Sequence, residues 1–300
     1  MASVTAERTR ASAAMRVSRF FYRHPHGRLG LLLGGPLSWF LLVYIGSLVV
    51  LFLSAFWSVD VFTGETVHNW GLQNFQTLLN GDVYRTITLR TVGLAAAVTL
   101  TDIVLAFPLA YYAARLATPR RRNAILVAVI IPLWANYLVR VFSWKLILSQ
   151  TGLLNWTVEK LGIGSLQIAN SSWAIWLTFS YLWLPFTLLP IYGALERVSP
   201  SFLEASSDLG GKGWMTFRRV VFPLIVPGIV AGSIFSFSLT LGDYIVPSLV
   251  GNTKFIGNVI YDSVGVANNV PLAAAYAFVP VAIMAIYLLI AKRLGAFEAI

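Results

Sequence analysis

The feature that most constrains this fold is a run of apolar residues from Leu29 to Val59 that contains no charged side chain. A bilayer core of about 30 Å needs about 20 helical residues at a rise of about 1.5 Å each, so this run is long enough to cross a membrane. The apolar core of a signal peptide is only about 7–15 residues long. We therefore expect the run to be retained as a membrane span, with no cleavable signal peptide.

Similar apolar runs recur along the 300 residues of the chain. Hydrophobic residues make up 57% of the sequence and charged residues 11%, whereas soluble domains carry roughly 25% charged residues. A single soluble core cannot hide so much apolar surface. We expect an all-α membrane protein with six transmembrane helices, at roughly 33–57, 90–114, 124–144, 172–193, 224–248 and 273–292.

Lys and Arg are distributed unevenly between the connections of these spans. Sixteen lie in the N-terminal tail, the two inner connections and the C-terminal end, whereas four lie in the opposite loops (Arg85, Lys145, Lys160 and Lys254). Because Lys and Arg gather in cytoplasmic loops, both termini are expected in the cytoplasm. The expected organisation is a basic cytoplasmic tail at 1–28 and a six-span domain at 29–300. No soluble domain remains that could bind nucleic acid, so the net charge of +10 indicates membrane topology.

The longest inner connection, residues 194–223, is too polar to span a bilayer. Ser199-Pro200 is a helix-start signal, Ser201 and Glu204 have the spacing of a capping box, and Gly210-Gly211 is expected to end the helix. A second short helix is expected from Trp214 to Val220, with Pro223 starting the fifth span. Asp208 is four residues from Glu204 and from Lys212, so it is expected to share a helix face with both. A rigid, charged element of this kind suits docking to another protein.

This connection resembles the EAA loop in the permease subunits of ABC importers. That pattern is Glu-Ala-Ala, three residues, Gly, nine residues, an aliphatic residue, a spacer, an apolar residue and Pro. The chain has Glu204-Ala205-Ser206, Gly210 and Val220-x-Phe222-Pro223 at the same spacing, with Ser206 in place of the second Ala. The alternative is an ordinary cytoplasmic turn.

The resemblance implies a type I ABC importer permease fold in a bacterial cytoplasmic membrane. It also implies that Glu204, Ala205 and Gly210 lie on a coupling helix that inserts into a groove of a dimeric ATPase subunit. The other implied partners are a second permease, an extracytoplasmic solute-binding protein and the lipid bilayer. A P-loop requires Gly-x-x-x-x-Gly-Lys-Ser/Thr, and the run from Gly210 to Trp214 lacks that spacing. We therefore expect a transport subunit that is not an enzyme and holds no metal or cofactor of its own, with ATP and Mg²⁺ bound by the partner.

Three further segments resemble spermidine/putrescine permeases: 131–144, 152–155 and 240–247. The resemblance implies polyamine import, while permeases for iron, phosphonates or sulfate share the scaffold. An intramembrane enzyme or a channel without an ATPase is a remoter alternative. The three His residues (His24, His26 and His68) all lie outside the expected spans, which disfavours an intramembrane hydrolase.

A carboxylate at membrane depth usually faces protein or water, so Asp243 is a candidate partner for an ammonium group in transit. The alternative is an interspan hydrogen bond or a salt bridge, for example with Arg140. Tyr244, Tyr137 and Trp144 are candidates for cation–π contacts, or else for packing and interfacial anchoring. For Asp102, a structural role is favoured over a place in the substrate path.

Overall fold

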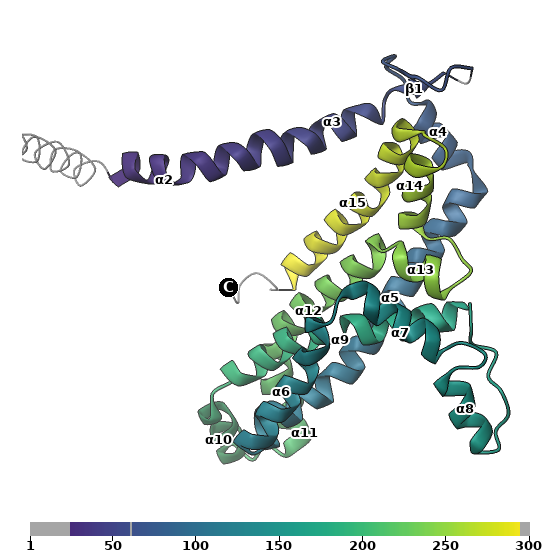
Figure 1. Ribbon diagram of the computed structural model, residues 1–300. Helices are drawn as coiled ribbons and strands as arrows, with labels where there is room; N and C mark the ends of the chain where they lie inside the picture. Colours follow the sequence, from purple (N-terminus) through teal and green to yellow (C-terminus); the bar gives the residue numbers. More distant parts are fainter. Residues whose placement is uncertain (1–24, 61, 295–300) are drawn as a thin grey trace, which may run out of the picture. The chain divides into compact units, whose positions relative to one another are not determined.

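The computed structural model describes residues 25–60 and 62–294, and the chain divides into two compact units, Met1–Ser54 and Ala55–Ile300. Most of the basic tail expected at 1–28 therefore lies outside the described residues. In the first unit, helix α2 (Pro25–Trp39) continues through the π-helical segment η1 (Phe40–Ile45) into α3 (Gly46–Ser54) (Figure 1). Residues 32–54 of this run are long and apolar enough to span a membrane, as the sequence predicts.

The second unit is almost entirely helical apart from a short antiparallel pair of strands (Figure 1). In chain order its elements are β1 (Ser58–Val59), β2 (Thr66–Val67), α4 (Gln73–Asn80), α5 (Asp82–Tyr111), η2 (Tyr112–Leu116), α6 (Pro119–Trp134), α7 (Tyr137–Ile147), α8 (Leu153–Lys160), α9 (Ser172–Arg197), α10 (Pro200–Asp208), α11 (Gly213–Thr216), η3 (Phe217–Val221), α12 (Phe222–Gly242), α13 (Ile245–Val250), α14 (Ile256–Gly265) and α15 (Val270–Arg293).

The centre of this unit is formed by α5, α9 and α12, which pack against one another along their length (Figure 1). Small residues allow the close approach of α9 and α12, since a Cβ on Gly232 would lie 2.7 Å from the carbonyl oxygen of Thr187. Small residues at helix contacts are typical of membrane bundles, where van der Waals packing replaces the hydrophobic effect. The helices α14 and α15 pack together beside α12, with Tyr276 of α15 fully buried.

The described part of the chain has five helices long and apolar enough to cross a membrane, and a sixth span if one bent pair is counted as a single span. That bent pair is the expected third span: α6 and α7 meet at 99°. The span expected over 124–144 is therefore present as two helices and not as one continuous helix. Asn136 explains the break, because its side chain accepts a hydrogen bond from the backbone N–H of Leu138 (2.9 Å) and so starts a new helix. At 16 and 11 residues, the two halves are about 24 and 17 Å long, each too short to cross the bilayer core alone.

The fifth span also differs from the expectation. The helix runs without a break from Gly213 to Gly242, so neither the separate short helix from Trp214 nor a span start at Pro223 is found. Pro223 cannot donate a backbone hydrogen bond to the preceding turn. The preceding turn is the π-helical segment η3, whose different hydrogen-bond pattern lets the helix continue past this proline. At its other end, the expected continuation to residue 248 is interrupted at Asp243, which has an extended backbone (φ −75°, ψ 134°), and the chain restarts as α13.

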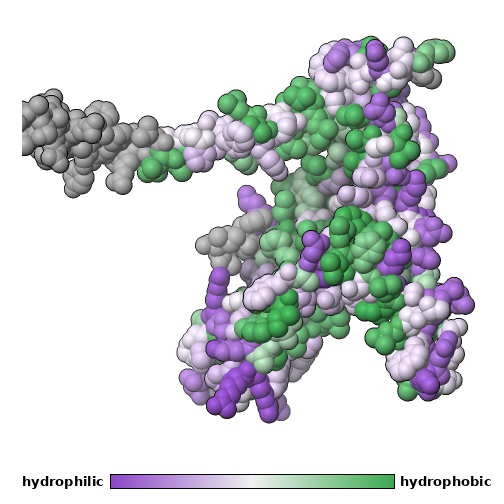
Figure 2. Space-filling view, viewed as in Figure 1, coloured by the Kyte–Doolittle hydropathy of each residue, from purple (hydrophilic) through white to green (hydrophobic). Residues whose placement is uncertain are grey.

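Hydrophilic side chains gather at the end of the second unit where α6, α10 and α11 lie, and apolar surface covers much of the helices that lead away from that end (Figure 2). This is the pattern of a protein whose middle is solvated by lipid.

Candidate functional site

The expected coupling loop folds as one short helix, α10, between α9 and α11. Its N-cap is Ser199, whose hydroxyl accepts from the backbone N–H of Ser201 at 3.4 Å. The capping box expected from Ser201 and Glu204 is therefore wrong: Pro200 occupies the first helical position, which moves the cap two residues earlier.

The end of α10 follows the sequence prediction. Gly210 has φ +78°, a left-handed conformation that glycine adopts without steric cost, and the backbone N–H of Gly211 donates to the carbonyl of Ser206 at 2.8 Å. The hydroxyls of Ser206 and Thr216 are 2.8 Å apart and join α10 to α11. The expectation that Asp208 and Lys212 share a helix face is wrong, because α10 ends at Asp208. Glu204, Ala205 and Asp208 are exposed on α10.

Exposed apolar side chains lie beside these acidic residues. Phe202 is 52% exposed and Leu209 is 88% exposed. Both line a surface pocket together with Ala205, Ser206, Gly211, Met215, Arg219 and Val220. A helix that presents large apolar side chains to the aqueous end of a membrane protein is suited to contact another protein.

The second candidate region is the break between α12 and α13. Here one carboxylate oxygen of Asp243 accepts hydrogen bonds from the backbone N–H groups of Ile245 (2.8 Å) and Val246 (2.9 Å), while the other accepts one from the Tyr137 hydroxyl at the start of α7. The broken third and fifth spans therefore meet at this carboxylate. Every one of these donors is neutral, and Asp243 is half-buried.

The expected alternative of a salt bridge between Asp243 and Arg140 is wrong. The Arg140 guanidinium carbon lies 6.0 Å from the centroid of the Tyr137 ring, and its buried Nε has no hydrogen-bond partner. Within residues 25–60 and 62–294, the ion pairs are Arg122–Glu196 and Lys254–Asp262. The interspan hydrogen bond that we left open for Asp243 is present, with Tyr137 as its donor.

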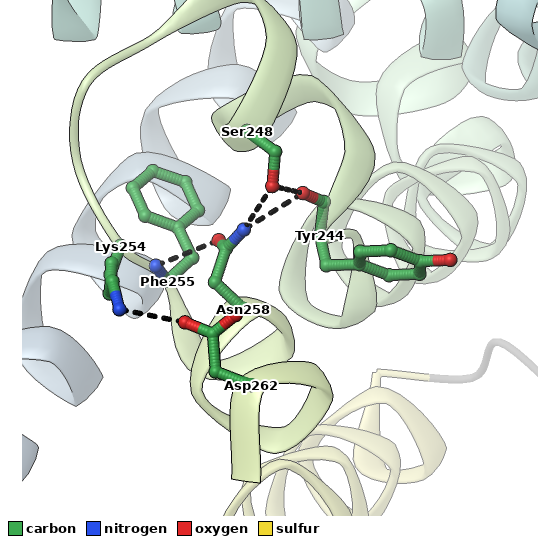
Figure 3. A network of polar contacts seen from close by, with 6 residues as sticks. All are labelled: Tyr244, Ser248, Lys254, Phe255, Asn258 and Asp262. Atoms are coloured by element: carbon green, nitrogen blue, oxygen red, sulfur yellow. Dashed lines mark hydrogen bonds and ion pairs between the residues drawn. The ribbon is translucent and has the colours of Figure 1, made fainter. Parts of the chain in front are cut away.

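A polar network holds the break in place from the side of α14 (Figure 3). The Asn258 amide donates to the Tyr244 carbonyl (2.9 Å) and the Ser248 hydroxyl (2.6 Å), and its oxygen accepts from the backbone N–H of Phe255 (3.0 Å). The backbones approach closely, since a Cβ on Gly257 would lie 2.9 Å from the carbonyl oxygen of Gly242. Only glycine fits there without movement.

Aromatic rings belong to the segments that meet at the break. The Tyr244 ring stacks on Tyr261 of α14 (centroids 4.7 Å apart, 12° between planes), and these side chains are 37% and 54% exposed. The Tyr137 ring stacks on the Trp183 ring of α9 at 6.0 Å. Tyr261, Trp183 and Asn258 were absent from our sequence-based candidates, because their role depends on contacts between distant segments that no local motif indicates.

The remaining two candidate residues, Trp144 and Asp102, contact other side chains. Trp144 packs against Tyr181 of α9 (5.2 Å between centroids). Asp102 of α5 is fully buried and accepts from the Ser236 hydroxyl of α12 at 2.6 Å, leaving its second oxygen without a partner. Ser236 precedes Asp243 by seven residues, or about 10 Å along the helix. The structure therefore brings Asp243, Tyr244 and Tyr137 together and assigns Asp102 an interhelical contact.

Comparison with known proteins gives a consistent result. Residues 106–297 match the family described as binding-protein-dependent transport system inner membrane component. The chain is 44% identical over 299 residues to the inner membrane ABC transporter permease protein YdcU of Escherichia coli (strain K12), covering 95% of each chain. It is 33% identical over 227 residues to the spermidine/putrescine transport system permease protein PotB of the same organism, covering 74% of this chain and 82% of the relative.

A solved structure of a bacterial alginate ABC transporter, in complex with an alginate-pentasaccharide-bound periplasmic protein, has a similar fold. Its matching chain superposes with a TM-score of 0.73 at 17% identity, covering 93% of this chain and 97% of that one. Together with the apolar helices, these likenesses show a multi-pass plasma-membrane protein with the type I ABC permease fold, a transport subunit and not an enzyme. The chain belongs to the family of binding-protein-dependent transport system inner membrane components, the permease subunits of ABC importers.

Proposed function

We propose that this permease carries polyamines such as spermidine or putrescine, and that Asp243 contacts an ammonium group of the solute during transit. The observation that carries the proposal is the set of Asp243 partners. Two backbone N–H groups and one tyrosine hydroxyl surround the carboxylate, and all three are neutral. A carboxylate held at membrane depth by neutral donors retains its attraction for a cation, because low-dielectric surroundings screen charge weakly.

The aromatic rings beside Asp243 fit the same solute class. Cation–π contacts with tyrosine or tryptophan are worth about 0.5–2 kcal/mol each. Tyr137 donates its hydroxyl hydrogen bond to Asp243 itself, and the partly exposed stack of Tyr244 and Tyr261 begins at the next residue of the chain, so we expect a ring face near an ammonium group bound at Asp243. The likeness to PotB, which is named as a spermidine/putrescine permease, supports this choice over other solutes on the same scaffold.

We further propose that α10 docks into a groove of a separate ATPase subunit. The exposed Phe202 and Leu209 supply apolar contact area, and the exposed Glu204 and Asp208 supply charge. The left-handed Gly210 turns the chain sharply at the end of the docking element. In this account ATP and Mg²⁺ bind to the partner, a second permease completes the path, and a solute-binding protein delivers the solute from outside. ATP binding drives transport because it favours one of two conformations of the permease pair, open to the outside or open to the cytoplasm.

The test is uptake of labelled spermidine by cells that lack the native gene and express either the native chain or Asp243→Asn. The amide keeps an oxygen that can accept the backbone hydrogen bonds of Ile245 and Val246, so the variant removes the charge and preserves the break. We expect spermidine uptake to fall to background while the chain remains in the membrane at its normal level.

The matched control is Asp262→Asn, which removes one carboxylate charge from the neighbouring helix α14, where the side chain is partly exposed and paired with Lys254. It is expected to leave uptake within about twofold of native, since exposed ion pairs contribute little. Normal spermidine uptake by a well-expressed Asp243→Asn variant would remove Asp243 from the path. Uptake of iron, phosphonate or sulfate in place of spermidine by the native chain would refute the polyamine assignment.

A further inference from the structure

The guanidinium of Arg115 joins the inner end of α5 to the end of α9. Arg115 lies in the π-helical segment η2, and its Nη2 donates to the carbonyl oxygens of Leu195 (2.6 Å) and Val198 (2.5 Å). Both acceptor residues are buried, at 0% and 3% exposure. The Leu195 carbonyl also accepts a longer bond from the backbone N–H of Val198 (3.3 Å). The last carbonyls of a helix lack their usual partners in a following turn, and a cation at that end is favoured by the helix dipole.

Arg115 therefore binds the chain directly before the start of α10. Val198 is the C-cap of α9, and the next residue, Ser199, is the N-cap of α10. One residue separates Val198, whose carbonyl accepts from Arg115, from the first residue of α10. A displacement of α10 is therefore expected to move the carbonyl that the guanidinium binds. By contrast, the nearby pair of Arg122 and Glu196 is 3.5 Å apart with both side chains more than 40% exposed, which makes it a weak link.

The local backbone of Arg115 is also unusual. In η2 the backbone N–H of Ala117 donates to the carbonyl of Tyr112 (2.8 Å), five residues earlier. Such a π-bulge inserts one extra residue into a helix turn and occurs often at functional positions. The other end of α10 has its own tether, through the hydroxyl contact between Ser206 and Thr216 of α11.

We propose that Arg115 is a positioning residue that makes α10 and α5 move as one body, so that a displacement of α10 by the ATPase is passed to α5. The inference rests on the proposed docking of α10. Helix α5 packs along α9 and α12 through the centre of the bundle, and it carries Asp102, which bonds to Ser236 of α12. A push on α10 therefore reaches α5 and, through that hydrogen bond, α12, the helix that ends at the break beside Asp243. Other contacts of α10 with the bundle are made by Leu203, which packs on the buried cluster around Leu195, and by α11 and η3.

The test compares native chain, Arg115→Gln and Arg115→Lys in the complete transporter reconstituted in liposomes with its ATPase. The glutamine amide is too short to reach both carbonyls. We expect ATPase subunits to stay attached and ATP hydrolysis to continue, while spermidine taken up per ATP falls at least about tenfold, as the loss of a charge-assisted hydrogen bond suggests. Lysine keeps the charge and can reach one carbonyl, so it is expected to restore part of the ratio.

The matched control is Arg120→Gln, which removes the same charge from an exposed position in the first turn of α6. It is expected to match the native chain. A second measurement does not depend on the solute. The chain has no cysteine, so spin labels on Leu116→Cys, at the end of η2, and Ser207→Cys, on α10, report the distance between these elements. In the native background, we expect one narrow distance distribution that is unchanged by ATP and vanadate; in Arg115→Gln, we expect a broadened or shifted one.

Two outcomes overturn the inference. The first is an Arg115→Gln transporter with the native uptake per ATP and the native distance distribution. The second is a parallel loss of ATPase attachment and all activity in both Arg115 variants, which indicates a role in folding alone. If the native chain imports no spermidine, the polyamine proposal fails, but the distance measurement still decides the role of Arg115. If no ATPase attaches to the native chain, the docking proposal fails, and with it this inference.

Discussion

The network around Asn258 gives the sharpest prediction about how the break between α12 and α13 is held. Asn258→Ala removes the side-chain amide and with it the hydrogen bonds to the Tyr244 carbonyl, the Ser248 hydroxyl and the backbone N–H of Phe255 (Figure 3). The Tyr244 carbonyl keeps a partner, because the Ser248 hydroxyl also donates to it at 2.7 Å. The N–H of Phe255 does not, and Phe255 is fully buried.

The magnitude follows from these contacts. A neutral hydrogen bond contributes about 1 kcal/mol net, and a buried donor left without a partner costs about 1–3 kcal/mol. Two lost bonds and one unpaired donor therefore lower the free energy of unfolding by about 3–5 kcal/mol. Since the loosened segment carries Asp243, spermidine uptake is expected to fall as well.

The assay is unfolding of the purified protein in mixed micelles, followed by tryptophan fluorescence as the fraction of SDS is raised. Lys254→Gln is the matched control from the same network, because it breaks only the exposed ion pair with Asp262, in which the lysine side chain is 67% exposed. It is expected to change stability by less than about 1 kcal/mol. The reasoning is refuted if Asn258→Ala unfolds within about 0.5 kcal/mol of the native protein, a difference that distant surface changes also produce.

Three further predictions concern the turns and close contacts. Gly210→Val places a β-branched residue at φ +78°, which costs about 1–2 kcal/mol; it should reduce spermidine uptake while leaving membrane levels normal. Gly257→Ala puts a Cβ 2.9–3.0 Å from backbone atoms at the end of α12, so it should lower thermal stability and uptake together, whereas Gly213→Ala, with open space around it, should change neither. The pKa of Asp60 lies below its ordinary value of 3.8, because the backbone N–H groups of Thr63 and Phe62 donate to its carboxylate. The stabilisation is present above that ordinary value and is lost as pH falls through the lower pKa of the folded turn, so chemical shifts of this turn should change only below about pH 4.

Much of this fold could be predicted from the sequence. Apolar runs of about 20 residues indicate membrane spans on their own, and the spacing of Glu204, Ala205 and Gly210 indicates a coupling helix. The end of that helix at Gly210 was predictable because a left-handed residue favours glycine. Its start at Ser199-Pro200 was predictable as well, because proline suits the first helical position; only the capping box from Ser201 and Glu204 is not found.

The breaks in the third and fifth spans escaped the sequence analysis for a physical reason. Hydropathy averages over a window, and a single polar residue such as Asn136 or Asp243 barely changes it. The break at Asp243 is stabilised by partners more than ten residues away, Asn258 of α14 and Tyr137 of α7. Local patterns cannot reveal such contacts. For the same reason, the sequence does not show that Arg140 lies near the ring of Tyr137 and forms no salt bridge with Asp243.

The central claim is that α10 transmits the action of a separate ATPase to this permease, and one crosslinking measurement tests it most directly. Because the chain contains no cysteine, Glu204→Cys provides a unique reactive site on α10, with Lys160→Cys in the opposite loop as a matched exposed control. In intact cells, a thiol crosslinker is expected to join position 204 to an ATPase subunit, and position 160 should give no such product. Failure of position 204 to reach an ATPase, or its labelling by a membrane-impermeant thiol reagent from outside the cell, would contradict the account.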